Sequence, residues 1–143
     1  MTFKCCKDCI IDMICTDPCE KFKVEEVQID NLSNFNNCLR LMKKYNNKKF
    51  VTSNISIEIE SDSISIYKNN KLHRDDGPAV IYSDGSKEWY KNGKLHRDNG
   101  PAIMNNNGYI AWYKNNKLHR DDGPAIIITN GSKIWYKNGV RIK

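Results

Sequence analysis

Several features are missing from this sequence, and each absence excludes a class of protein. The 143 residues contain no run of about 18 apolar residues, so no transmembrane helix is expected. The first residues lack both an apolar stretch of signal-peptide type and a small-residue cleavage site. The expected compartment is therefore the cytoplasm, where clustered cysteines more often bind metal or stay reduced than form disulfides.

Recognisable catalytic chemistry is missing as well. Outside its repeats the chain shows no nucleophile–base pair, phosphate-binding loop or pair of catalytic carboxylates. A His-Arg-Asp triplet occurs three times, at residues 73–75, 96–98 and 119–121, and echoes the catalytic loop of protein kinases. The glycine-rich loop, the strand lysine and the Asp-Phe-Gly segment that kinases need are absent. We therefore predict that the protein is not an enzyme and that a small-molecule substrate is not its ligand.

Aliphatic residues are scarce and charge is unevenly placed. Hydrophobic residues make up 39% of the chain, with three Trp and seven Tyr, which suits a thin, elongated structure better than a sphere. Residues 1–66 hold nine basic and ten acidic side chains, whereas residues 67–143 hold fourteen and seven. The basic half raises the expectation of an acidic partner such as nucleic acid, an anionic membrane or an acidic protein.

A gapless repeat of 23 residues fills the second half. Residues 67–89, 90–112 and 113–135 are three copies, and residues 136–143 begin a fourth. Aromatic residues recur at the same spacing, as Tyr67, Tyr90, Tyr113 and Tyr136, and as Trp89, Trp112 and Trp135.

Each copy carries two turn signals. Asn92-Gly93 lies between strand-like flanks, and both residue types accept the positive φ of a type I′ hairpin turn. Asn69-Asn70 and Asn115-Asn116 stand at the same place in the other copies. A second turn is predicted at residues 83–86 and its equivalents, with short runs of β-forming residues between the turns. The pattern predicts a mainly β fold, an elongated antiparallel array of β-hairpins that forms a meander.

The segment before the first full copy is predicted to be a degenerate capping repeat, residues 54–66. Apolar residues alternate through Ile55, Ile57 and Ile59, then Ile64 and Ile66, which indicates a hairpin that turns at residues 61–62. Residues 1–53 are predicted to form a Cys-rich and helical N-terminal cap. Its helix is expected near residues 32–45, with Ser33 as the N-cap and an apolar stripe that packs on the degenerate repeat.

Four N-terminal cysteines have the spacing of a metal site. Cys6, Cys9, Cys15 and Cys19 lie within fourteen residues, and a two-residue spacer lets one loop present two thiolates to a tetrahedral ion. A structural zinc ion is one interpretation. Reduced packing cysteines and disulfides are the alternatives.

The aromatic rows and the lysines beside them are the candidate partner-binding residues. Trp89 and Tyr90 are adjacent, so on a strand they point to opposite faces. One row then belongs to the core and the other to an open binding surface, or both rows simply pack the sheet. Lysines flank the first turn of each copy, including Lys91, Lys94, Lys114 and Lys117. A basic edge beside aromatic rows suits single-stranded nucleic acid, and it also discourages strand pairing at a sheet edge.

The repeat resembles the MORN family of β-hairpin repeats. That family's unit has the form Tyr-x-Gly-x-Trp-x-x-Gly-Lys-x-His-Gly followed by an Asp-Gly turn, and Trp89, Gly93, Lys94 and His96 match its core. Arg97 stands where the family has Gly, and every copy inserts Asp-Asp/Asn-Gly-Pro-Ala. This variant is similar to repeat proteins predicted in large DNA viruses and tailed phages, which implies a viral protein in the host cytoplasm.

The sequence therefore predicts a non-enzymatic repeat module that binds a macromolecular partner. A protein partner, in a scaffold or protein–protein complex, is the first expectation, because stacked repeats create an extended surface. A nucleic-acid or ribonucleoprotein binder that uses the basic edge and aromatic rows is the alternative. Binding to an anionic membrane surface is the third.

Overall fold

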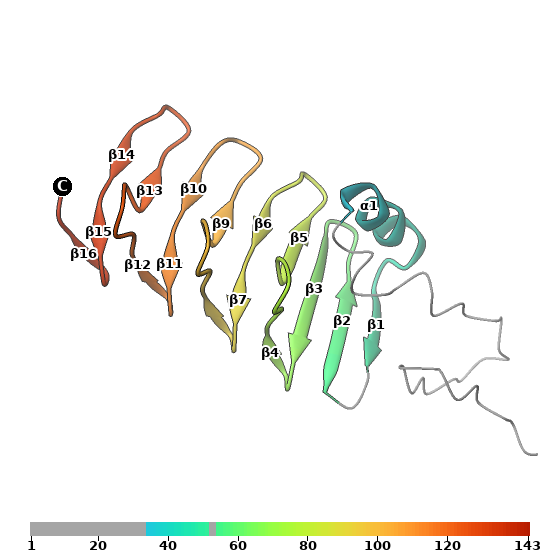
Figure 1. The fold of residues 1–143 in the computed structure, drawn as a ribbon. Coiled ribbons are helices and arrows are strands. Elements are labelled where there is room, and N and C mark those ends of the chain that lie inside the picture. The colour runs from blue at the N-terminus through green and yellow to red at the C-terminus, as the bar shows by residue number, and fades with distance from the viewer. Residues whose placement is uncertain (1–33, 52–53) are drawn as a thin grey trace, which may run out of the picture.

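The structure is a computed structural model, and it describes residues 34–51 and 54–143. One short helix, α1 (Phe35–Lys44), precedes a long antiparallel sheet that extends away from it in a single direction (Figure 1). No helix in these two ranges is long and apolar enough to span a membrane. The mainly β hairpin meander predicted from the turn signals is confirmed.

Ten strands form the main sheet, in the order β1-β2-β3-β5-β6-β9-β10-β13-β14, with β4 paired to β3. Their bounds are β1 Lys48–Val51, β2 Ile55–Ile59, β3 Ser63–Lys68, β4 Lys71–Leu72, β5 Val80–Tyr82, β6 Lys87–Glu88, β9 Ile103–Met104, β10 Ile110–Ala111, β13 Ile126–Ile127 and β14 Lys133–Ile134. Strands follow the chain order, so each pair is joined by a local connection and no crossover is needed.

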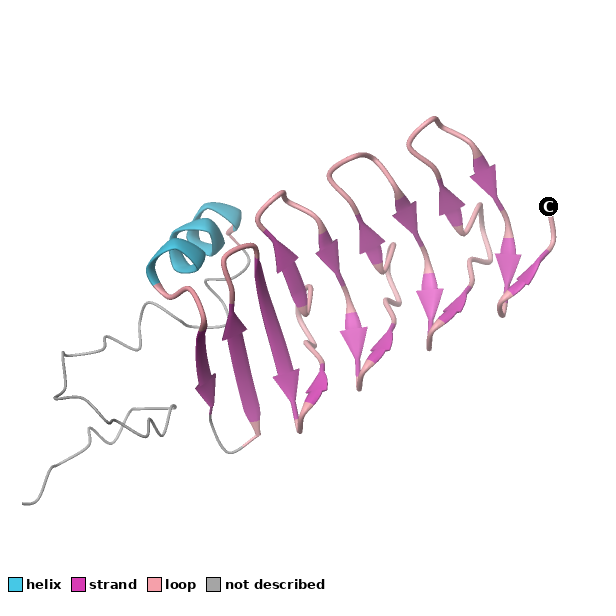
Figure 2. Cartoon of the chain, turned by 180° about the vertical axis from the view of Figure 1, so that it is seen from behind, coloured by secondary structure: helices cyan, strands magenta, loops and turns pink. Residues whose placement is uncertain are grey.

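Each repeat builds two hairpins in two tiers. The upper hairpins, such as β5–β6, belong to the main sheet, and three lower hairpins form separate two-stranded units (Figures 1 and 2). The lower strands are β7 Tyr90–Lys91, β8 Lys94–Leu95, β11 Tyr113–Lys114, β12 Lys117–Leu118, β15 Tyr136–Lys137 and β16 Val140–Arg141. The run of β-forming residues that joins the upper hairpin to the lower one is interrupted at Trp89, which separates β6 from β7.

The lower hairpins turn at the predicted Asn-containing pairs. Asn92 and Gly93 have φ of 53° and 77°, and each of the other lower turns also has two consecutive residues with positive φ. Two consecutive left-handed residues define the type I′ turn, whose twist matches that of the flanking strands. Asparagine and glycine enter this region at the lowest steric cost, so the local sequence fixes the hairpin register.

Helix α1 caps the first strands and builds the main apolar core. Asn34, rather than Ser33, is its N-cap, since its side chain accepts from the Asn36 backbone N–H at 3.0 Å. The core contains Cys38, Leu41, Met42, Tyr45, Phe50, Ile57, Ile59, Ile64, Ile66 and Ile81. The apolar stripe of the helix thus packs on the alternating isoleucines, as expected. Strand β1 was not predicted, and it extends the sheet by pairing with β2.

The later repeats bury much less. Their fully buried side chains are small, and Ala102, Ala111 and Ala125 have no exposed surface. The alanine of each Gly-Pro-Ala segment is bonded to the preceding strand; the Trp89 N–H, for example, donates to the Ala102 carbonyl at 2.8 Å. With so few large buried side chains, the polar loops must contribute more to holding these repeats together.

Candidate partner-binding surface

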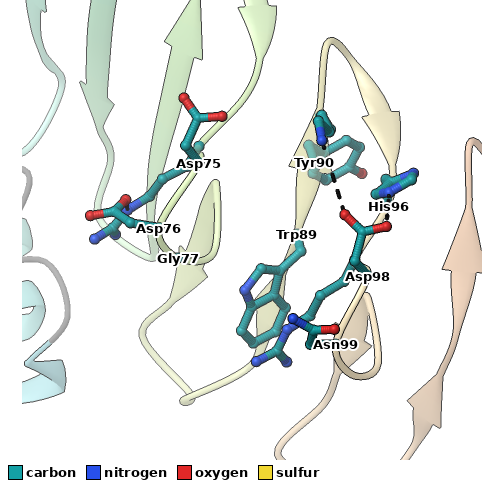
Figure 3. Close-up of a pocket in the computed structure, with 11 residues that line it drawn as sticks. Asp75, Asp76, Gly77, Trp89, Tyr90, His96, Asp98 and Asn99 are labelled. Atoms are coloured by element: carbon teal, nitrogen blue, oxygen red, sulfur yellow. Dashed lines mark hydrogen bonds and ion pairs between the residues drawn. The ribbon is translucent and has the colours of Figure 1, made fainter.

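The two aromatic rows lie on opposite faces of the array. Tyr90 pairs directly with Leu95, which places both side chains on one face, and Trp89 precedes Tyr90 and faces the other way. In Figure 3 the two rings leave the strand in different directions. We call these faces the Trp face and the Tyr face.

On the Trp face, arginines lie over the tryptophan rings. The Arg97 guanidinium is 4.0 Å from the Trp89 ring centroid, and Arg120 lies 4.1 Å from that of Trp112. At the end of the array the Lys143 ammonium lies 5.2 Å from the Trp135 ring centroid. Such cation–π stacks cover the rings and stabilise the loop that follows each lower hairpin.

A glycine lies against each guanidinium. It belongs to the Asp-Asp/Asn-Gly-Pro-Ala segment, which the MORN repeat lacks. A Cβ added to Gly123 would be 2.9 Å from the Arg120 Cζ, and one added to Gly77 would be 2.8 Å from the Arg74 Cζ. No real Cβ approaches so closely, so the glycine makes room for the arginine. Arg74 is the equivalent arginine of the first copy, in which Ile66 precedes Tyr67 where later repeats have Trp, and its side chain is 3% exposed. The arginine of each His-Arg-Asp triplet thus makes packing contacts within its own loop.

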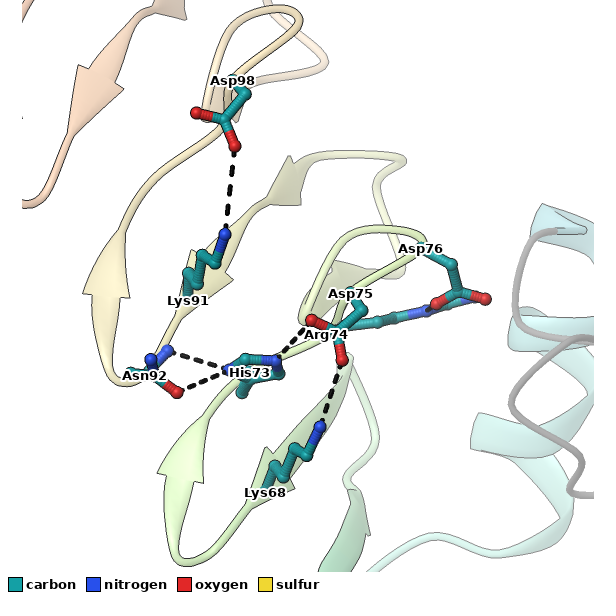
Figure 4. Close-up of polar contacts among 8 residues, drawn as sticks. All are labelled: Lys68, His73, Arg74, Asp75, Asp76, Lys91, Asn92 and Asp98. Atoms are coloured by element: carbon teal, nitrogen blue, oxygen red, sulfur yellow. Dashed lines mark hydrogen bonds and ion pairs between the residues drawn. The ribbon is translucent and has the colours of Figure 1, made fainter.

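The histidines join neighbouring repeats. His73 Nδ1 accepts from the backbone N–H of Asn92, one repeat further on, at 3.0 Å, while Nε2 lies 2.9 Å from an oxygen of Asp75 (Figure 4). Nδ1 also lies 3.0 Å from the side-chain oxygen of Asn92, so the imidazole ring bridges Asn92 and Asp75. His96 and His119 repeat the arrangement. We call this contact the histidine clip.

The histidine clip changes the acidity of its carboxylates. The hydrogen bond from His73 lowers the pKa of Asp75, and the bond from Lys68 lowers it further. The hydrogen bond from His96 likewise lowers the pKa of Asp98. Both aspartates therefore stay ionised, and negative charge is fixed in the loop of each repeat.

The predicted basic edge lies on the Trp face. The lysines on the two sides of each lower turn, such as Lys91 and Lys94, are cross-strand partners. Each is adjacent in sequence to a residue of the Tyr face, so its side chain points to the Trp face. Several contact the loop carboxylates: Lys68 lies 3.2 Å from Asp75, Lys91 lies 4.0 Å from Asp98, and Lys137 lies 3.1 Å from Asp121. These ion pairs satisfy part of the positive charge within the array.

Two grooves on the Trp face lie between successive loops. They enclose about 260 and 510 Å³ and are lined by the same arginines, histidines and aspartates that hold the loops. The first runs between Asp75 and Asp98, as Figure 3 shows. The side chains there already bond to one another, so the grooves follow from the packing of the repeats.

On the Tyr face a row of tyrosines and leucines runs through the lower hairpins. Register pairs Tyr67 with Leu72, and the same pairing recurs in the next two hairpins. Backbone hydrogen bonds join neighbouring hairpins, for example Gly93 N–H to the Leu72 carbonyl at 2.8 Å. The resulting Tyr–Leu stripe consists of Tyr67, Leu72, Tyr90, Leu95, Tyr113, Leu118 and Tyr136, all half-buried.

Nothing in the described part of the chain packs over the Tyr–Leu stripe. Helix α1 and the arginine-bearing loops lie on the Trp face, with the core isoleucines and the tryptophans. The stripe is nevertheless partly desolvated by its own neighbours. Burial raises the pKa of Tyr113, and burial followed by Glu88 raises the pKa of Tyr90 well above its ordinary range. Phenols that stay neutral and half-buried form an amphipathic surface.

The structure thus separates the candidate residues into three groups. The tryptophans lie beneath cations on the Trp face, and the lysines that flank the lower turns point to the same face. The tyrosines form a stripe on the opposite face. The leucines of the stripe and Glu88 were missed, although the two-residue turns fix a register that pairs Tyr67, Tyr90 and Tyr113 each with a leucine.

The four predicted zinc ligands, Cys6, Cys9, Cys15 and Cys19, lie outside the described residues. Within residues 34–51 and 54–143, no three His, Cys, Asp or Glu side chains are grouped to hold a metal ion. Cys38 is buried in the apolar core, and burial raises the pKa of its thiol. The zinc hypothesis therefore stays a prediction.

Comparison of the chain with protein-family models, with curated proteins and with solved structures found no match. The MORN likeness consequently rests on the residues of the repeat alone.

Proposed function

We propose that this chain is a non-enzymatic module that binds a protein partner along its Tyr–Leu stripe. The observation that supports this function is a continuous row of half-buried tyrosines and leucines with no described element over it. Stacked repeats contact mainly their neighbours and present extended surfaces, which suit macromolecules better than small molecules.

The chemistry of the stripe is that of an interface. Tyrosine is enriched among the residues that dominate binding energy, because it offers a large ring and a polar tip with few rotatable bonds. The leucines between the rings supply apolar area, and Tyr90 and Tyr113 can anchor a partner that lies along the array. The tryptophans are a poorer choice, because Arg97 and Arg120 already occupy the ring faces.

Site-specific photo-crosslinking tests this proposal. A benzophenone amino acid placed at Tyr113 lies on the stripe, and one placed at the neighbouring Lys114 points to the opposite face, so the two variants form a matched pair. Each full-length variant is irradiated in extract of the native cell. We expect a protease-sensitive adduct from the Tyr113 position and none from Lys114. Equal adducts from both positions, or none from Tyr113, would contradict a partner on the stripe.

Substitution separates binding from folding. Tyr113→Ala should weaken partner capture by about 2 kcal/mol or more if the ring is an anchor. Trp112→Ala should instead lower the free energy of unfolding by about 3 kcal/mol, because it removes the floor on which Arg120 stacks. Urea unfolding followed by circular dichroism measures the second effect. If Tyr113→Ala also mainly unfolds the protein, the stripe is core and the proposal fails.

Nucleic acid on the Trp face is the second candidate function. The observation that favours it is a set of exposed lysines at 23-residue spacing, Lys71, Lys94 and Lys117, for which the described residues show no ion pair. Binding of a labelled 20-nucleotide oligothymidine should then fall steeply with added salt, because phosphate contacts release counterions. Lys94→Ala/Lys117→Ala should flatten that dependence. Tyr113→Ala, on the other face, should leave it unchanged.

A further inference from the structure

The Tyr face differs in charge from one end to the other. At its first repeats, carboxylates lie among the tyrosines: the Tyr90 hydroxyl donates to Glu88 at 3.0 Å, and burial followed by the charge of Glu88 raises the pKa of Tyr82. Burial, then Glu58 and to a smaller extent Glu60, raise the pKa of Tyr67. This end of the face therefore combines aromatic rings with negative charge.

Positive charge is scarce on the same face. Of the cations in the described strands, register places Lys49 and Arg141 there, opposite Glu58 and Tyr136. Lys49 is already bound to Glu58 at 2.6 Å. Arg141 lies in the last strand, far along the array from Glu88 (Figure 1). The acidic end thus has no unpaired strand cation of its own, although the whole chain carries a net charge of +6.

A groove opens beside these carboxylates. It encloses about 360 Å³ between the tips of the first two upper hairpins and is lined by Tyr82, Asp84, Ser86, Glu88, Asn105, Asn106 and Asn107. Two carboxylates, a phenol and three amides converge there, and no cation lines the groove. Asp62 and Asp84 also act on Tyr82 and raise its pKa, after burial and Glu88.

This chemistry belongs to the first repeat alone. The positions equivalent to Glu88 are Ala111 and Ile134, so the later repeats carry apolar residues there. The positions equivalent to Asp84 are asparagines, and Asn130 makes the same turn contact, because its side chain accepts from the Ser132 backbone N–H at 2.9 Å. Asp84 makes that contact to Ser86 at 2.8 Å. The turn therefore does not require the charge of Asp84, and the fold does not require that of Glu88.

We infer that the partner segment bound on the Tyr face is a basic polypeptide, whose lysine or arginine side chain enters the Tyr82–Glu88 groove. This inference rests on the proposed function, which places a protein along the Tyr–Leu stripe, and it adds the chemistry of that protein. A cation in the groove meets the carboxylates of Asp84 and Glu88 and the ring of Tyr82, which together provide ion pairing and cation–π contact. Polyanions are repelled by the same carboxylates.

Fluorescence anisotropy with defined probes tests the inference. The purified full-length chain is titrated against three labelled probes: a ten-residue alternating Lys-Ser peptide, the matching Glu-Ser peptide and a 20-nucleotide oligothymidine. We expect the Lys-Ser peptide to bind and the Glu-Ser peptide not to bind. Asp84→Asn/Glu88→Gln should weaken the Lys-Ser peptide about fivefold, the effect of two partly exposed ion pairs.

The control is a double variant that removes two charges from the other face. In the double variant Asp76→Asn/Asp122→Asn, both positions are equivalent to Asn99 of the second repeat. The repeat therefore tolerates asparagine at this place. The double variant should alter binding of the Lys-Ser peptide less than twofold. In the unmodified protein, amide chemical shifts should respond to this peptide at Tyr82, Glu88 and Tyr90 rather than at Trp112, a readout that does not depend on a variant folding.

Four results would overturn the inference: no binding of the Lys-Ser peptide, equal binding of the Glu-Ser peptide, equal weakening by both double variants, or shifts confined to the Trp face. Oligothymidine that binds and is weakened by Asp84→Asn/Glu88→Gln would also overturn it, in favour of nucleic acid. A protein adduct at Tyr113 without binding of the Lys-Ser peptide leaves the proposed function standing and refutes only the basic partner.

Discussion

Replacement of Gly123 by alanine tests the packing that holds the repeats together. The guanidinium of Arg120 lies between the Trp112 ring, at 4.1 Å, and the backbone of Gly123. An alanine Cβ would come within 2.9 Å of the Arg120 Cζ and 3.1 Å of its Nε. The φ of Gly123 is not positive, so alanine meets no backbone penalty there. In the folded protein Gly123→Ala should therefore act only by displacing the guanidinium.

Two opposing effects set the magnitude. Loss of a partly buried cation–π stack costs about 1–2 kcal/mol, since the Arg120 side chain is 25% exposed. Alanine also restricts the unfolded chain, which stabilises the protein by about 0.4–1 kcal/mol wherever the native backbone accepts it. We therefore expect Gly123→Ala to lower the free energy of unfolding by about 1 kcal/mol. In the Arg120→Ala background the obstacle is gone, and the same change should stabilise by about 0.5 kcal/mol.

A double-mutant cycle measures this reversal of sign. Urea unfolding of the wild type, the two single variants and Arg120→Ala/Gly123→Ala, followed by circular dichroism, gives a coupling energy that should be about 1–2 kcal/mol. Gly100 provides a contrast, because its φ of 151° penalises alanine whether or not Arg97 is present. If Gly123→Ala destabilises equally in both backgrounds, the arginine does not explain the glycine and the reasoning is wrong.

Three further predictions follow from the turns, the histidine clip and the cysteines. Gly93→Val should destabilise the second lower hairpin by about 2 kcal/mol or more in urea unfolding, because a β-branched residue resists φ of 77°. The depressed pKa of Asp98 should stabilise the fold fully above its ordinary pKa of about 3.9 and lose that effect as pH falls through the lower folded value. His96→Gln should raise this pKa in a carboxyl-carbon NMR titration, and an unchanged value would contradict the clip. Metal analysis should find about one zinc per chain, lost with Cys6→Ser/Cys9→Ser, whereas freely titratable thiols without zinc would retire that hypothesis.

The sequence allowed the meander of hairpins to be predicted because the turns are local. Asn92-Gly93 and its equivalents choose a type I′ turn through backbone preference alone, and the alternating isoleucines fix which side of β2 and β3 is buried. The helix was predicted from its apolar stripe, but its start moved from Ser33 to Asn34, since either residue type can cap.

Other features depended on contacts between distant residues. The interruption at Trp89 and the stacking of Arg97 on its ring involve residues eight positions apart, and no propensity encodes them. The backbone N–H that donates to His73 Nδ1 belongs to Asn92 of the next repeat, nineteen residues further on. Equal spacing of the aromatics indicated a surface, but it gave no reason to choose the tyrosines over the tryptophans. That choice required the positions of the arginines.

Differences among the repeats follow the two tiers. From Tyr67 to Ala79 and its copies, nearly every position is identical, and this segment contains the lower hairpin, the histidine clip and the stacked arginine. From Val80 to Glu88 the copies diverge, and this segment is the upper hairpin, where Glu88 is replaced by Ala111 and Ile134. A contact that every repeat needs to stack on its neighbour must recur in every copy. A side chain that recognises one part of a partner has no such constraint, so the upper hairpins on the Tyr face are where a repeating scaffold can carry a non-repeating specificity.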